Sequence, residues 1–249
     1  MSAVQVEERF YRYVMGSPDL TSFQVTEGES DLWVAVDRES WSPHLPDRVR
    51  DLVRRVRGEL ESYVARDSLF LTSLEPVTVA PDAPAIAREM AEAAARVGVG
   101  PMAAVAGAVA EVVARGLLPE VREVIVENGG DVFLCTRKPR RVGLLAGTSP
   151  FSLRVGLLIP GDGTPVAVCT SAGRWGHSLS LGRADAAVAV APSGALADAA
   201  ATRLGNLVRD AADLLRALEE ARRLPGLTGA VLVRDSRLAA WGEIQLTPF

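Results

Sequence analysis

The sequence contains little lysine and little cysteine. Of its 27 basic residues only Lys138 is a lysine, which we interpret as a compositional bias of the genome rather than a functional feature. Two cysteines are too few for a disulfide framework, so Cys135 and Cys169, both in strand-like runs, are predicted to be buried free thiols. The net charge of −4 gives no general argument for nucleic-acid binding, and we expect none.

Long apolar runs are also absent. No uninterrupted apolar stretch approaches the ~20 residues needed to span a bilayer, so no membrane segment is predicted. Residues 1–10 carry Glu7, Glu8 and Arg9 and no apolar core, which argues against a signal peptide in this stretch. We therefore expect a cytoplasmic protein that does not associate with membranes.

The chain does contain enough apolar sequence for a large buried core. Its 249 residues are 48% hydrophobic, and their periodicities predict an α+β fold, a mixed, largely antiparallel sheet with packed helices. We expect a single domain over 1–249, with strands and a helix in 1–75 and a core in 76–249 that carries the candidate site. The predicted strands are 10–15, 22–27, 32–37, 121–127, 132–136, 141–145, 153–159, 165–170, 188–191, 230–234 and 238–245, and the predicted helices are 47–66, 83–97, 101–115, 195–202 and 210–223.

One predicted helix is built from unusually small residues. Between Ala103 and Ala110 nothing is larger than valine, and Gly107 lies in the middle. Glycine inside a helix costs about 1 kcal/mol relative to alanine, so a compensating contact is expected. Either another backbone or a flat ligand comes close to this face, or the face packs tightly on the sheet. The same composition leaves room for a homodimer.

A carboxylate and a hydroxyl share one face of the predicted helix 195–202. Asp198 and Thr202 are four residues apart, which brings their side chains together, with Ser193 as the expected N-cap and Gly205 as the expected break. Both are hard oxygen donors of the kind that Mg²⁺ prefers. The alternative is that Asp198 is a solvated residue favoured by the helix dipole.

Two further stretches could bind phosphate. In Asn128-Gly129-Gly130-Asp131, the two glycines permit positive φ and a turn whose amides face an anion. The basic run 137–141 is expected either to be solvated or to dock an acidic partner or a phosphate.

The two histidines differ in their surroundings. His177 lies in a turn flanked by Gly173 and Gly176, and it is the candidate general base because its ordinary pKa is near neutrality. It could equally contact a ligand or be structural. Next to it, Arg174 could pair with a phosphate or point to water. Its neighbour, Trp175, could stack on a ring system or fill the core. His44, in a proline-bracketed loop, is expected to be solvated.

Four of these stretches together resemble the ApbE superfamily, the FAD:protein FMN transferases. Asp198-Ala-Ala-Ala-Thr202 is similar to the family's Asp-Ala-x-x-Thr-Ala signature, and 128–131 to its Gly-Gly-Asp/Asn segment. Residues 169–173, Cys-Thr-Ser-Ala-Gly, are similar to its Ala-Thr-Ser-Gly turn. His177 falls where the family has the histidine of His-x-x-Asp-Pro. The resemblance covers roughly residues 75–210.

The resemblance implies an ApbE-like fold with FAD and Mg²⁺ as cofactors. It implies transfer of FMN from a flavin nucleotide to a hydroxyl of an acceptor protein. In this reading Asp198 and Thr202 are metal ligands and His177 is catalytic. The implied cofactor-binding residues are Asn128, Gly129, Gly130, Asp131, Thr170, Ser171, Gly173 and Arg174.

The chain also departs from the family pattern. The family's lysine in Ala-Lys-Gly would fall near Ala106, and the position three after His177 is Ser180 rather than aspartate. Two alternatives to FMN transfer therefore stay open. The protein could bind a flavin or another nucleotide without transferring it, or it could be an ApbE-fold enzyme for a different substrate.

Overall fold

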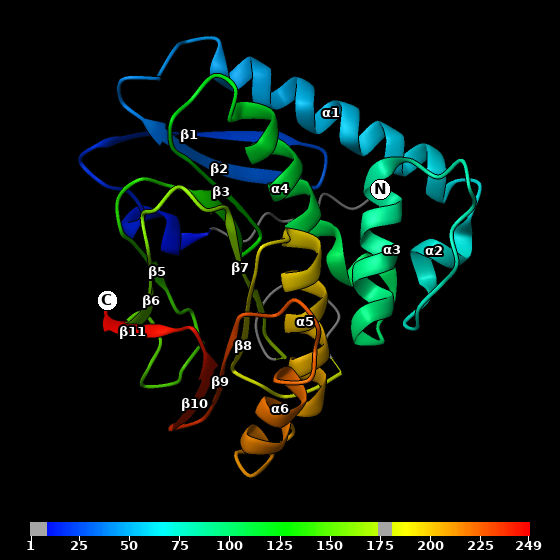
Figure 1. The fold of residues 1–249 in the computed structure, drawn as a ribbon, viewed down its shortest axis with the longest axis vertical. Coiled ribbons are helices and arrows are strands. Elements are labelled where there is room, and N and C mark those ends of the chain that lie inside the picture. The colour runs from blue at the N-terminus through cyan, green and yellow to red at the C-terminus, as the bar shows by residue number, and fades with distance from the viewer. Residues whose placement is uncertain (1–8, 174–180) are drawn as a thin grey trace.

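The fold consists of two antiparallel sheets with helices on one face of the larger sheet (Figure 1). The structure is a computed structural model, and it describes residues 9–173 and 181–249. The eight strands of the larger sheet are, in spatial order, β1 (Leu20–Glu27), β2 (Ser30–Asp37), β3 (Val124–Asn128), β4 (Asp131–Cys135), β7 (Val166–Ser171), β8 (Ala186–Ala191), β9 (Gly229–Arg234) and β10 (Arg237–Gly242). The smaller sheet has the order β11 (Gln245–Pro248), β6 (Val155–Ile159) and β5 (Arg140–Gly143).

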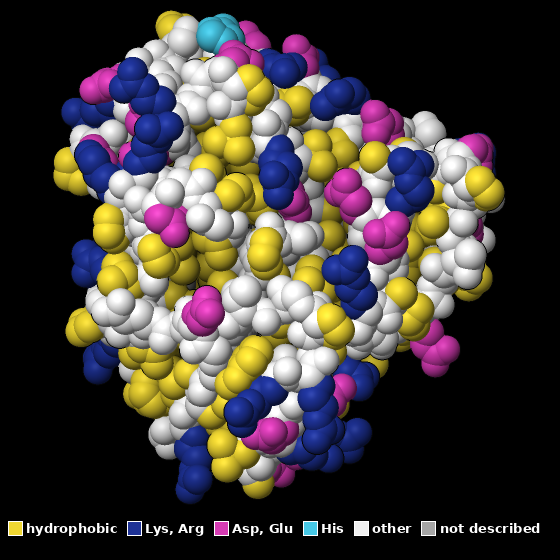
Figure 2. Space-filling view, viewed as in Figure 1, with side chains coloured by type: hydrophobic (Ala, Val, Ile, Leu, Met, Phe, Trp, Pro, Cys, Tyr) yellow, Lys and Arg dark blue, Asp and Glu magenta, His cyan; other side chains and the backbone are white. Residues whose placement is uncertain are grey.

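The α+β fold predicted from the sequence is thereby confirmed. The main helices are α1 (Leu45–Val64), α3 (Ala85–Val97), α4 (Val105–Leu117), α5 (Gly194–Leu207) and α6 (Asp213–Ala221). Short helical segments are η1 (Phe10–Val14), α2 (Ser68–Thr72) and η2 (Pro101–Ala104). Basic and acidic side chains are intermingled over the face shown in Figure 2, which fits the small net charge.

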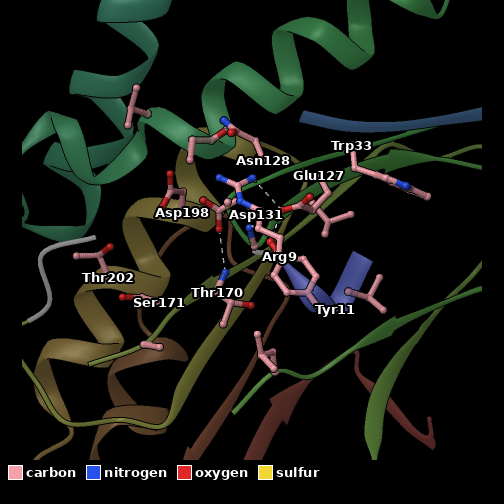
Figure 3. A pocket seen from close by; sticks show the side chains of 18 of the residues that line it. Arg9, Tyr11, Trp33, Glu127, Asn128, Asp131, Thr170, Ser171, Asp198 and Thr202 are labelled. Carbon is pink, nitrogen blue, oxygen red and sulfur yellow. Dashed lines mark hydrogen bonds and ion pairs between the residues drawn. The ribbon is translucent and has the colours of Figure 1, made fainter. Parts of the chain in front are cut away.

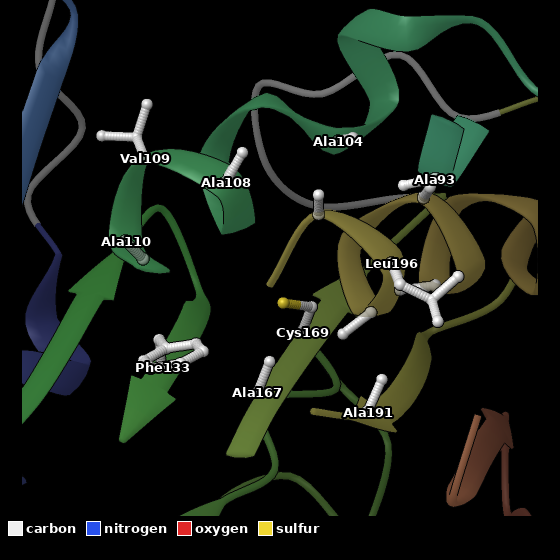
Figure 4. Close-up of a cluster of buried hydrophobic side chains, with 14 of the residues drawn as sticks. Ala93, Ala104, Ala108, Val109, Ala110, Phe133, Ala167, Cys169, Ala191 and Leu196 are labelled. Carbon is white, nitrogen blue, oxygen red and sulfur yellow. The ribbon is translucent and has the colours of Figure 1, made fainter. Parts of the chain in front are cut away.

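Side-chain alternation along the central strands builds two separate cores. On β8, Ala187 and Ala189 face the helices, whereas Val188 and Val190 face the smaller sheet. Small residues on the helix side let α4 and α5 lie close to the sheet (Figure 4). The valines on the other side fill the space between the sheets, because successive residues of a strand point to opposite faces. Residues at strand ends therefore reach one layer or the other according to their register.

The small-residue run of α4 makes a backbone contact with α5. A Cβ on Gly107 would lie 2.3 Å from the carbonyl oxygen of Gly194, and a Cβ on Gly194 would lie 2.2 Å from that of Gly107. The crossing is held by Glu111, whose Oε2 accepts from the Gly194 amide at 2.7 Å. Ser193 caps α5 as predicted, by accepting from the Leu196 amide. Of the contacts expected for this helix, the structure has the close approach of another backbone and also the packing on the sheet, against β3 and β4.

Several predicted boundaries were wrong. The segment 10–15, predicted as a strand, forms the 3₁₀ helix η1 instead. Its Arg12 side chain binds Glu127 on β3 and Asp31 on β2, so the segment crosses these strands and does not pair along the edge of the sheet. The predicted helix 101–115 is broken at Ala104, whose backbone has φ −118° and ψ 2°. Gly205 does not end α5, since it packs on Ser171 and Ala187 of the sheet and the helix continues to Leu207.

Other details follow from turns and burial. The predicted strand 238–245 is split at Gly242, which has φ +98° and sends β10 and β11 into different sheets. Cys135 and Cys169 are buried free thiols, as predicted.

Within the described ranges, no single helix has the length and apolar composition to cross a membrane. Only α3 taken together with the segment Pro101–Leu117 passes such a test, by length and composition alone, and the two parts are bent by 102°. Both parts contribute buried residues to the larger core.

Candidate functional site

A cavity of about 1260 Å³ opens where the β3–β4 turn, the end of β7 and helix α5 meet. Its polar end is lined by eight residues singled out from the sequence: Asn128, Gly129, Gly130, Asp131, Thr170, Ser171, Asp198 and Thr202 (Figure 3). The cavity extends between the two sheets, where Trp33, Leu158 and Phe249 give it apolar walls. Three sequence elements separated by up to about seventy residues thus meet at one place.

Of the other predicted residues, only Gly173 is described by the structure, and it is not part of this wall. Gly173 lies at a separate pocket with Gly182, and its amide donates to the carbonyl of Ala184 at 2.9 Å. Arg174 and His177 lie outside the described residues, so their predicted roles stay predictions.

Asp131 is the first residue of β4, and its register turns the side chain toward the helix layer. Its Oδ1 accepts from the Thr170 amide at 3.0 Å, which links the β3–β4 turn to the end of β7. Burial raises the pKa of Asp131 well above its ordinary value, and the nearby charge of Asp198 raises it further. It is therefore unfavourable for Asp131 and Asp198 to be ionised together unless a positive charge lies between them.

Asp198 reaches the same place from α5. Its Oδ2 accepts from the Gly107 amide at 3.0 Å, a contact that the glycine crossing of α4 and α5 makes possible. Burial raises the pKa of Asp198 to about 7, although hydrogen bonds from the Gly107 and Ala106 amides and from Asp131 favour its ionised form. Two carboxyl groups this close hold on to a proton in the absence of a cation.

These groups fit a magnesium ion. The side chains that line the cavity around the carboxylate pair offer oxygens, from Asp131, Asp198 and the hydroxyl of Thr202, while the buried thiol of Cys169 contacts Asp131 from outside the lining. In 9–173 and 181–249 no group of three or more His, Cys, Asp or Glu side chains is arranged to hold a metal. Mg²⁺ uses one or two carboxylates and completes its shell with water and substrate phosphate, so a small oxygen set suits it.

The pKa shifts predict an unusual pH dependence of stability. An unfolded aspartate titrates near pH 4, so between about pH 4 and 7 the folded protein binds more protons at Asp131 and Asp198 than the unfolded chain does. Stability, and with it the melting temperature, should therefore fall as the pH rises through this window when no divalent cation is present. Carboxyl groups whose pKa is lowered in the folded protein, such as that of Asp19, change the stability only at pH values below this window.

Differential scanning calorimetry between pH 5 and 7.5 checks this expectation. Asp198→Asn removes one titrating group and relieves its partner, so its melting temperature should change much less with pH. A slope of the same size in the variant would show that other groups cause it.

The Gly-Gly turn is a tight hairpin connection. Gly129 and Gly130 have φ of +67° and +101°, conformations that favour glycine. The amide of Gly130 donates to Oε1 of Glu127 at 2.8 Å, so it is engaged within the protein. The side-chain amide of Asn128 donates to the Ala106 carbonyl at 3.1 Å, which ties the turn to α4.

A charged cluster beside this turn was missed by the sequence analysis. Glu127 is 1% exposed and binds Arg12 at 2.6 Å, while the Tyr11 hydroxyl donates to its other oxygen at 2.9 Å. Burial first, and the charge of Glu127 second, raise the pKa of Tyr11. Arg12 also binds Asp31 at 2.9 Å. No local signal could reveal these contacts, because η1 and Glu127 are more than a hundred residues apart.

The basic run 137–141 is partly neutralised within the fold. Arg140 is buried and pairs with Asp19 at 2.9 Å and Glu123 at 2.6 Å, and Lys138 also pairs with Asp19. His44 is exposed, as expected, and contacts Glu120.

The hydroxyl of Ser171 is also notable. It is buried at the polar end and has no hydrogen-bond partner among the described residues. A buried hydroxyl of this kind fits a place where a bound molecule completes the hydrogen bonding.

Comparisons with known proteins find related sequences and related folds. A family model described as "AbpE bacteria" matches residues 14–226. The UPF0280 protein of Methanocella arvoryzae is 42% identical over 195 residues, which are 78% of this chain and 79% of that protein. The UPF0280 protein of Methanopyrus kandleri is 42% identical over 229 residues, covering 89% of this chain and 90% of that protein.

Two solved structures share the fold at low sequence identity. The apo flavinyl transferase ApbE of Pseudomonas stutzeri aligns with a TM-score of 0.57 and 15% identity, over 90% of this chain and 94% of that chain. The ApbE protein of Thermotoga maritima aligns with a TM-score of 0.53 and 12% identity, over 90% and 96%.

Proposed function

The chain belongs to the ApbE superfamily, and from that premise we propose that it binds a flavin nucleotide together with Mg²⁺ and transfers FMN from FAD to a hydroxyl of an acceptor protein. The observation that carries this proposal is the pair of neighbouring carboxyls, the buried Asp131 and the half-buried Asp198, at the polar end of a large cavity. Two such groups create a demand for positive charge that a divalent cation meets.

The size and polarity of the cavity support a dinucleotide ligand. At about 1260 Å³ it exceeds the ~1,000 Å³ upper range of ordinary ligand pockets. Its polar end suits phosphate groups with their counter-ion, and its apolar walls between the sheets suit a ring system. The same volume leaves space for the hydroxyl-bearing segment of an acceptor.

The residues divide the work as follows. Asp198 and Thr202 would hold Mg²⁺, which when bound would neutralise the pyrophosphate and stabilise the departing phosphate. Asn128 and Gly107 keep α4 in place behind the metal ligands, through the hydrogen bonds that they donate. The acceptor oxygen would bond to the FMN phosphorus, the bond to AMP would break, and the proton would pass to a base. His177 is the base proposed from the sequence.

A two-stage experiment tests this function. The protein should bind FAD in the presence of Mg²⁺, measured by isothermal titration calorimetry, and ligand released from the purified protein should be identified by mass spectrometry. Incubation with FAD, Mg²⁺ and a protein carrying a flavinylation motif should then add the mass of FMN and release AMP. Absence of FAD binding with Mg²⁺ present would contradict the proposal.

The same experiment separates transfer from binding alone. Ala106 stands where the family has a lysine, which favours a protein that holds a nucleotide without transferring it. FAD binding without AMP release or mass addition would select that alternative. Binding of another nucleotide in place of FAD would select an enzyme of different substrate. The cytoplasmic location and the homodimer expected from the sequence stay predictions.

A further inference from the structure

Among the residues that the structure describes, few cations line the cavity, and one of them lies at its polar end. Among the described lining residues the basic side chains are Arg9, Arg140 and Arg141. Arg140 pairs with Glu123, which precedes β3, whereas the candidate site lies at the opposite end of that strand. Arg141 is exposed on β5 and contacts the carbonyl of Pro248 in the smaller sheet. Of the described cations that line the cavity, Arg9 is therefore the one next to the β3–β4 turn, and its neighbour Arg12 does not line the cavity.

The contacts of Arg9 within the protein use one nitrogen of its guanidinium group. In the cluster beside the turn, Arg12 takes the short contacts, at 2.6 Å to Glu127 and 2.9 Å to Asp31. Arg9 lies farther from the same carboxylates, at 3.9 and 3.4 Å, and its short hydrogen bond goes to the Asp31 carbonyl at 2.6 Å. All of these contacts use Nη1. A guanidinium has five N–H donors, so within residues 9–173 and 181–249 the Nε and Nη2 groups of Arg9 keep donors for a ligand.

Arg9 and the β3–β4 turn both approach the same atom, Oε1 of Glu127. Oε1 of Glu127 accepts from the Gly130 amide at 2.8 Å and lies 3.9 Å from Nη1 of Arg9. Figure 3 shows the Arg9 side chain reaching from the N-terminal segment toward Glu127 and Asp131, while Asp198 approaches Asp131 from α5. The turn thus has a cation on one side and the candidate metal ligands on the other.

We propose that Arg9 binds a phosphate oxygen of a nucleoside diphosphate group held at this turn. Near Asp131 and Asp198 a phosphate is repelled unless positive charge is supplied, and the Gly130 amide is already engaged. Arginine suits the task, because its planar guanidinium donates two parallel hydrogen bonds to phosphate. This assignment rests on the proposed nucleotide function, and it adds Arg9, the residue just before η1, to the proposed binding residues.

The test compares ligands with and without phosphate. With Mg²⁺ present, Arg9→Gln should weaken FAD binding by about 10- to 100-fold, the effect of losing a charge-assisted hydrogen bond, in calorimetric titrations. Binding of riboflavin, which has no phosphate, should be unchanged. Arg9→Lys should fall between the parent and Arg9→Gln. The control Arg216→Gln, which changes an exposed arginine of α6 that does not line the cavity, should bind both ligands like the parent.

Other results would overturn the assignment. Unchanged FAD affinity in Arg9→Gln, or an equal loss for riboflavin, means that Arg9 does not bind phosphate. The melting temperature should stay close to that of the parent, because Arg12 carries the anchoring contacts. If Arg9→Gln does not fold, Arg9→Lys decides the question in the same comparison.

Failure of the flavin function is distinguishable from failure of this inference. If the parent binds neither FAD nor riboflavin, inorganic pyrophosphate with Mg²⁺ becomes the probe in a thermal-shift assay. Pyrophosphate should then raise the melting temperature of the parent and of Arg216→Gln, and not that of Arg9→Gln. No stabilisation of the parent, or the same stabilisation of Arg9→Gln, would refute the phosphate site.

Discussion

Asp198→Asn should lower Mg²⁺-dependent FMN transfer by about 10³-fold, since a metal's stabilisation of transition-state charge is worth several kcal/mol. The carboxamide keeps an oxygen that can accept from the Gly107 amide, so the helix crossing survives. What is lost is the negative charge that attracts the cation. Transfer is measured as AMP release under saturating FAD, and Mg²⁺ affinity by titration calorimetry.

The control for this substitution is Asp82→Asn. Asp82 is an exposed aspartate that pairs with Arg66 on the surface, so the same chemical change there should leave transfer and metal binding unaltered. Asp198→Asn should also melt at a higher temperature than the parent at pH 7.5 without Mg²⁺, because it removes a desolvated charge. A variant that transfers FMN at the parental rate would show that the metal is held elsewhere.

Gly107→Ala should destabilise the protein by about 3 kcal/mol, near the upper range for overpacking, which corresponds to a melting temperature roughly 6–12 °C lower. The added Cβ would lie 2.3 Å from the Gly194 carbonyl oxygen and 2.8 Å from the Asp198 Cβ. The first of these neighbours is backbone, so relief requires α4 and α5 to separate. That movement also withdraws the Gly107 amide from Asp198, and nucleotide affinity should fall with stability.

A matched substitution in another helix isolates the crossing as the cause. Gly58 lies on the exposed side of α1, and a Cβ there would meet nothing within 4 Å. Gly58→Ala should therefore stabilise the protein by about 0.5–1 kcal/mol, the ordinary gain in helix propensity. Chemical denaturation of both variants gives the comparison. If Gly107→Ala were as harmless as Gly58→Ala, the close approach of α4 and α5 would not be essential.

Much of the candidate site was predictable because its residues are marked by local pattern. The Asp198–Thr202 spacing, the Ser193 cap and the Gly129–Gly130 turn each depend on a few consecutive residues, and the structure places these residues at one cavity or beside it. The alternation in the central strands was equally local, and it led to the correct fold class. Element ends were less certain, as Gly205 illustrates, because packing on the sheet outweighed the tendency of glycine to end a helix.

Contacts between distant segments were decided only by the tertiary structure. The sequence by itself determined which side chains are available: a carboxylate and a hydroxyl on one helix, two glycines in a turn, and a run of small residues around Gly107. It did not determine that Gly107 would meet Gly194, or that η1 would bring Arg9 to Glu127 across more than a hundred residues. Strand register and helix crossing bring such groups together, and both depend on the packing of the whole chain rather than on any window of it.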